Sequence, residues 1–202
     1  MASRQHEHPV SAAEFTNDLA HDGVYIAAIA SYSPDPNKVN RYTLYREQAE
    51  RIEWCADAWL TVAEAEKLAT MANIRVGESD AMYMLGPIVV WYRHGDTLKI
   101  FSEDKLIFSL NGQEIVLHGN AINRAEIRSV HAYLDRGWVE CGLRLVLPKE
   151  EILIAYQVNE IASMDITYDG LNLLCDTWWA VALGRLLSEA LAVPYVPDED
   201  LA

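Results

Sequence analysis

Basic residues are scarce in this chain. Lysine and arginine together number 16 among 202 residues, against 30 aspartates and glutamates, and the formal net charge at pH 7 is −14. The phosphate backbone of a nucleic acid repels such a surface unless the few cations cluster, so we expect no nucleic-acid partner. Residues 150–202 hold ten acidic residues and a single basic one, Arg185, which places most of the excess negative charge in the last quarter of the chain.

Cysteine is scarce too. Cys55, Cys141 and Cys175 are far apart, odd in number and free of any C-x-x-C pair. This spacing favours reduced thiols that are buried as small apolar side chains. Residues 1–9 also lack the apolar segment of a secretory signal, and we expect a cytoplasmic protein.

An uninterrupted hydrophobic run is missing as well. The most apolar segment, residues 171–193, is long enough to span a bilayer, but it contains Asp176, Arg185 and Glu189. Charged side chains are costly at membrane depth. We therefore predict a buried helix in this segment and no membrane insertion.

The motifs of the commonest enzyme classes are absent. The sequence has no glycine-rich nucleotide-binding pattern, P-loop, H-E-x-x-H, G-x-S-x-G or EF-hand loop. Asp169 and Asp176 are spaced to share a helix face, but an N-cap at Asp169 and a favourable helix dipole at Asp176 account for them better than paired catalytic carboxylates do. We predict no catalytic residue and no cofactor, and whether the protein is an enzyme stays open, with a preference for a non-enzymatic role.

Histidines offer a weak case for a metal site. His118 and His131 come near the ends of two predicted strands that would be neighbours, but the spacing supplies no third ligand. Half-buried imidazoles that hydrogen-bond to their surroundings are the more economical interpretation. We predict no bound metal.

The first third of the chain carries helical signals. Ser11 and Glu14 have the spacing of a capping box, and the helix that they begin is expected to end near Gly23. A short apolar strand is predicted over 24–29, and the apolar spacing over 43–58 predicts a helix. Thr61 and Glu64 form a second capping box. We therefore expect residues 1–85 to be a mostly helical region packed on the rest of the protein.

The remainder, residues 86–202, is predicted to be an antiparallel β domain with a C-terminal helix. One strand is predicted on each side of Asn111-Gly112, over 106–110 and 113–117. This dipeptide is suited to a type I′ hairpin turn. The other strands are predicted over 88–92, 97–101, 126–134, 138–147 and 152–158, and the helix over 171–192. The expected fold class is α+β, either as one integrated domain or as two.

Seven predicted strands followed by one helix with Trp178 and Trp179 resemble the pleckstrin-homology-like barrel over residues 86–192. The resemblance implies a strongly bent antiparallel sheet that the C-terminal helix plugs at one end. Lipid-binding members of that family use lysines and arginines in the first hairpin loop, whereas the corresponding loops here, 94–96 and 102–105, are acidic or neutral. What the resemblance leaves is a fold often used for protein contacts.

Charge and the missing motifs together favour a non-catalytic protein-binding module. Its acidic surface would engage a basic partner, as an inhibitor or immunity-type protein masks a basic toxin. The expected partner-binding residues are Glu150, Glu151, Asp165, Asp169 and Trp178. The alternative is a small-molecule or lipid-binding protein, with or without hydrolytic activity, that uses the barrel interior or the seam between helix and sheet. A homodimer is compatible with both, and residues 197–202 are expected to be a solvated acidic tail.

Overall fold

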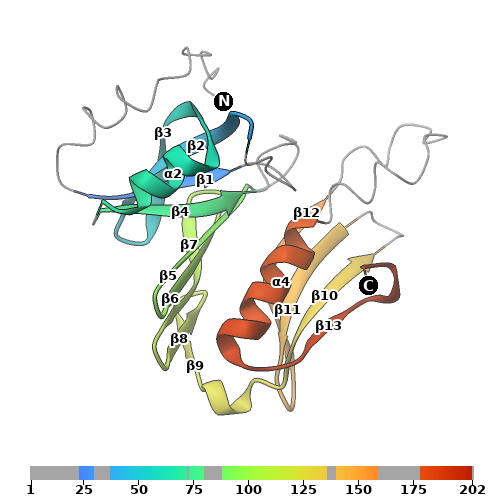
Figure 1. The fold of residues 1–202 in the computed structure, drawn as a ribbon. Coiled ribbons are helices and arrows are strands. Elements are labelled where there is room, and N and C mark those ends of the chain that lie inside the picture. Colours follow the sequence, from blue (N-terminus) through green and yellow to red (C-terminus); the bar gives the residue numbers. More distant parts are fainter. Residues whose placement is uncertain are drawn as a thin grey trace.

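Two β-sheets and a long helix between them make up most of the structure (Figure 1). The computed structural model describes residues 23–29, 37–71, 73–79, 88–135, 140–158 and 178–201. The first predicted helix and its capping box at Ser11 lie outside these residues.

The first sheet has nine strands in the order β3-β2-β1-β4-β5-β6-β7-β8-β9. A further contact between β3 and β7 closes the strands from β3 to β7 into a barrel. The barrel is mixed because β1 and β4 run parallel whereas the other pairs run antiparallel. The strands span Val24–Ile29 (β1), Asn40–Gln48 (β2), Arg51–Leu60 (β3), Ile74–Ser79 (β4), Val89–His94 (β5), Thr97–Ser102 (β6), Lys105–Asn111 (β7), Glu114–Leu117 (β8) and Asn120–Ile122 (β9).

The helix predicted over 43–58 is wrong, because these residues form the hairpin β2–β3. A β-bulge between Leu44 and Tyr45 explains the misleading pattern. The bulge makes Cys55 the extra residue of β3, so that Ile52 and Ala56 pack in different core clusters although they are an even number of positions apart. The apolar spacing that fits a helix face therefore joins residues on opposite faces of the strand.

The capping box at Thr61 and Glu64 is confirmed. The Thr61 hydroxyl accepts from the Glu64 backbone N–H at 3.2 Å, and the Glu64 carboxylate accepts from the Thr61 N–H at 2.8 Å. The helix that follows, α2 (Val62–Ala69), buries Ala65 and Leu68 against the barrel. The other helices and strands in the described part of residues 23–79 are all strands, so the expectation of a mostly helical first third is wrong there.

The hairpin around Asn111-Gly112 forms as predicted, but its turn lies one residue later. Asn111 pairs with Glu114, and Gly112 is the first loop residue, with φ +60°. Glycine with positive φ at the first loop position is typical of a type II′ turn. The following turn between β8 and β9 has positive φ at both His118 (49°) and Gly119 (77°), which is the type I′ pattern.

The second sheet has the order β12-β11-β10-β13. Its strands span Ser129–Asp135 (β10), Glu140–Val146 (β11), Glu151–Val158 (β12) and Tyr195–Pro197 (β13), with a short 3-10 turn, η1 (Arg124–Glu126), before β10. The antiparallel pairings of β10 with β11 and of β11 with β12 confirm three predicted strands.

Helix α4 (Trp178–Leu191) lies between the two sheets (Figure 1). Trp178 and Trp179 are both buried, and the Trp178 ring packs on Trp91 of β5 with centroids 5.9 Å apart. Gly184 lets Tyr195 and Leu143 approach the helix closely, since a Cβ there would meet Tyr195 at 2.5 Å. The predicted helix is thus confirmed from residue 178 onward, and its first residues lie outside the described part.

The barrel differs from the one expected over residues 86–192. Strands β5 to β9 belong to the sheet of β1 to β4, whereas β10 to β12 belong to the other sheet. The pairing of β4 with β5 also carries the first sheet across residues 85 and 86. The fold is therefore mostly β, with a barrel, extra strands and a C-terminal helix, and the N-terminal strands complete the barrel.

Inside the barrel, one carboxylate links strands that are not neighbours. Glu47 of β2 accepts a hydrogen bond from the Tyr92 hydroxyl of β5 at 2.8 Å and pairs with Lys99 of β6. The Glu47 side chain is only 7% exposed. Burial first, and then the adjacent Glu47 carboxylate, raise the pKa of the Tyr92 phenol, which keeps it a hydrogen-bond donor.

We predict that Lys99→Met lowers the free energy of unfolding by about 3 kcal/mol, because it leaves the buried Glu47 carboxylate without its cation. Urea denaturation measures the change. Lys105→Met is the matched control, since Lys105 is exposed on the next strand, and it is expected to change stability by less than ~0.5 kcal/mol. Equal effects of the two variants would contradict the account.

Candidate functional site

The second sheet has one face against α4 and one face away from it. Val130, Ala132, Leu143 and Leu145 point into the core that α4 shares. Because strand side chains alternate, their neighbours point to the opposite side. We call this side the outer sheet face. By the strand register it carries His131, Tyr133, Glu140, Arg144, Glu151, Tyr156, Val196 and the nearby Asp198.

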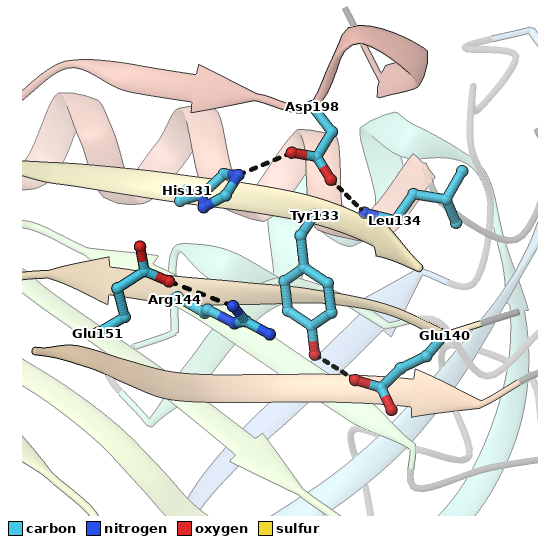
Figure 2. Close-up of polar contacts among 7 residues, drawn as sticks. All are labelled: His131, Tyr133, Leu134, Glu140, Arg144, Glu151 and Asp198. Atoms are coloured by element: carbon cyan, nitrogen blue, oxygen red, sulfur yellow. Dashed lines mark hydrogen bonds and ion pairs between the residues drawn. The ribbon is translucent and has the colours of Figure 1, made fainter. Parts of the chain in front are cut away.

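Asp198 joins the C-terminal segment to β10. Its carboxylate accepts from the Leu134 backbone N–H at 2.8 Å and contacts His131 Nε2 at 2.9 Å (Figure 2). The Asp198 backbone N–H also donates to the Ala132 carbonyl at 2.8 Å. Burial alone would raise the pKa of this carboxyl, but the hydrogen bonds from Leu134 and His131 outweigh it and hold the pKa below the usual value.

Arg144 and Tyr133 are stacked beside this contact (Figure 2). The Arg144 guanidinium carbon lies 4.0 Å from the centre of the Tyr133 ring, a cation–π distance, and Arg144 also donates to Glu151 at 3.2 Å. The Tyr133 hydroxyl donates to Glu140. Burial, followed by the Glu140 hydrogen bond, raises the pKa of the Tyr133 phenol, so it stays neutral.

Gly142 makes room for this arrangement. It pairs with Tyr133 on one side and Tyr156 on the other. A Cβ at Gly142 would lie 2.7 Å from both the Tyr133 hydroxyl and the Ala155 carbonyl. The absence of a side chain therefore allows the Tyr133 ring to lie over β11.

The outer sheet face combines acidic groups with exposed apolar ones. Tyr156 is 42% exposed and Val196 is 45% exposed. Glu140, Glu151 and Asp198 share this face with one guanidinium, that of Arg144, so these groups together carry negative charge. The described contact of the His131 ring is to the Asp198 carboxylate.

The structure places the predicted partner-binding residues in different environments. Glu150 and Glu151 are exposed at the turn that leads into β12, and Glu151 is part of the outer sheet face. Trp178 is 6% exposed and packs on Trp91, so its side chain belongs to the core. Asp165 and Asp169 lie outside the described residues.

The two candidate histidines lie in different contacts, and the cysteines differ in their exposure. His118 Nε2 contacts the Leu153 carbonyl at 2.8 Å, whereas His131 contacts Asp198. The described residues contain no group of three or more histidines, cysteines or acids arranged for a metal. Cys141 is buried as expected, but Cys55 is exposed on β3, and Cys175 lies outside the described part.

The acidic C-terminus is structured, not a solvated tail. Pro197 ends β13, which pairs in parallel with β10, and the 3-10 turn η3 (Glu199–Leu201) buries Leu201. The interpretation of residues 197–202 as a solvated tail did not predict the contacts of Asp198 with Leu134 and His131. Sequence reasoning also missed Tyr156, Val196 and the exposed Trp54 and Trp59 on β3, because their exposure depends on which strands pair.

Comparison with known proteins found no matching family model, no matching curated protein and no matching solved structure. In the described part of the chain, no helix has both the length and the apolar character needed to cross a membrane.

We predict that Asp198→Asn lowers stability at pH 7 by about 1 kcal/mol, a small value because the carboxylate is partly exposed and screened. A depressed pKa in the folded state stabilises above the ordinary value of 3.8 and loses this effect as pH falls through the folded value. The difference between wild type and variant should therefore disappear in acid. Denaturation from pH 7 to 2.5 measures it, with Glu114→Gln, an exposed acid on β8, as a control that is expected to show no such difference.

We predict that Gly142→Ala costs about 2 kcal/mol, because the new methyl group displaces the Tyr133 hydroxyl or the β12 backbone. Urea denaturation measures the loss, and the Tyr133 ring signals in an NMR spectrum report the displacement. Gly119→Ala meets open space but has φ +77°, so it is expected to cost about 1 kcal/mol from backbone strain and to leave Tyr133 unmoved. Wild-type stability of Gly142→Ala would refute this packing.

Proposed function

We propose that this protein is a non-catalytic binding module whose outer sheet face engages a basic segment of another protein. The observation that carries the proposal is that three hydrogen-bonded carboxylates, those of Glu140, Glu151 and Asp198, share one side of the second sheet with exposed Tyr156 and Val196 on its two edge strands. Aromatic and arginine side chains in the centre of a patch, with charged groups around them, are typical of protein interfaces.

Fixed geometry supports this assignment. Glu140, Glu151 and Asp198 each have a hydrogen-bond partner on a neighbouring strand or turn. Their orientation is therefore set before binding, which reduces the ordering entropy that association costs. A lysine or arginine of the partner would meet carboxylates in place and an aromatic ring, Tyr156, beside them.

Net charge supports a basic partner. At −14, the chain attracts cationic proteins over long range, and carboxylates at the rim of a contact mainly increase the association rate and its dependence on salt. Glu150, next to Glu151 and exposed, extends the negative rim to the β11–β12 turn.

We predict that the combined variant Glu150→Gln, Glu151→Gln and Tyr156→Ala no longer retains the partner. The assay is a pull-down from host extract at low and moderate salt, with bound molecules identified by mass spectrometry and the binary complex then rebuilt from purified components. The wild type is expected to retain a basic protein that salt releases.

The matched control combines Glu53→Gln, Glu114→Gln and Trp59→Ala. It removes the same number of negative charges and one exposed aromatic ring from the first sheet. It is expected to retain the partner as the wild type does. Loss of the partner from both variants, or recovery of a defined metabolite or lipid without any protein, would overturn the proposal.

A further inference from the structure

A small polar cavity lies at the far end of α4 from Trp178, and it is separate from the outer sheet face. Its volume is about 210 Å³, and it opens between the β5–β6 turn, the β7–β8 turn, η1 and the last turn of the helix. Polar groups of Arg93, Asp96, Gln113 and Arg124 line it, with Leu98 and Leu110 as its apolar part.

Two guanidinium groups are held at this cavity by consecutive residues of α4. Arg124 donates to the Ala190 carbonyl at 3.0 Å and to the Gly112 carbonyl at 3.2 Å, so it is fixed between the helix end and the β7–β8 turn. Arg93 donates to Glu189 at 2.9 Å. Cations from β5 and from η1, which are distant in the sequence, thus face one small space.

Both arginines keep donor capacity. A guanidinium has five N–H groups in a planar fork that matches a carboxylate or a phosphate. Arg124 uses two of its N–H groups in the described contacts, and Arg93 uses one. The Glu189 side chain is 73% exposed, and an exposed ion pair is a weak competitor for a ligand.

The cavity also holds a carboxylate and an amide. Asp96 and Gln113 also line it, and the Asp96 backbone carbonyl accepts from the Gly112 N–H at 3.3 Å. Asp96 disfavours a ligand with several negative charges and favours one that also carries a donor such as an ammonium group. A volume of about 210 Å³ suits a small molecule.

We propose that this cavity binds a small metabolite that carries one phosphate or carboxylate group and a hydrogen-bond donor. The oxyanion lies between Arg93 and Arg124, and the donor faces Asp96. The proposal does not depend on the partner-binding role of the outer sheet face, and the two can fail independently.

The test is an NMR titration of the full-length, ¹⁵N-labelled chain with three probes. O-phosphoethanolamine carries a phosphate and an ammonium group, β-alanine carries a carboxylate and an ammonium group, and ethanolamine lacks the oxyanion. We expect saturable shifts of the Gly112 amide and the Gln113 side-chain amide with the first or the second probe and none with ethanolamine. The better of the two identifies the oxyanion. No saturable shift at these groups with either one overturns the proposal.

Three variants test the role of Arg93. Arg93→Gln is expected to weaken the better probe at least about tenfold, because it removes a charge-assisted fork. Glu189→Gln frees Arg93 from its competitor and is expected to tighten binding about threefold. Arg128→Gln, at an exposed arginine four residues from Arg124, is expected to leave the affinity unchanged. Unchanged binding in Arg93→Gln, or weaker binding in Glu189→Gln, overturns the site.

Discussion

Trp91 of β5 and Trp178 of α4 meet with their ring centroids 5.9 Å apart, and this contact packs the first sheet on the helix that also packs on the second sheet. It is possible because β5 and β6 are buried on both faces. Val90 and Phe101 point into the barrel, whereas Leu98 and Ile100 join Trp91 in the core with α4. A strand buried on both sides must be apolar at successive positions, which is why residues 88–92 read as a continuous hydrophobic run.

The same packing leaves the outer sheet face of the second sheet out of contact with α4. Since α4 lies against the inner face of β10 to β13, the alternating side chains that point away are not needed for the core. They include polar and aromatic groups that contact one another, Asp198 with His131 and Arg144 with Tyr133. The C-terminal segment contributes to this surface because β13 pairs with β10 and brings Val196 and Asp198 beside His131.

Local signals in the sequence predicted local structure well. The hairpin near Asn111, the strands β10 to β12, the capping box at Thr61 and most of helix α4 depend on residues close together in the chain. The hairpin β2–β3 was misassigned because a bulge altered its period. The barrel depends on the pairing of β4 with β5 and of β1 with β4, and the candidate site depends on His131 meeting Asp198 across 67 positions. No local pattern encodes such contacts, so the acids after residue 150 could be recognised as a group but not as parts of a surface.

Site-specific photo-crosslinking tests most directly whether the outer sheet face is the binding surface. A photoreactive phenylalanine analogue placed at Tyr156 in the host cell should crosslink to one basic protein. The same analogue at Trp59, which is exposed on the first sheet, should not. Crosslinking of that protein from Trp59 and not from Tyr156 would contradict the account and move the interface to β3.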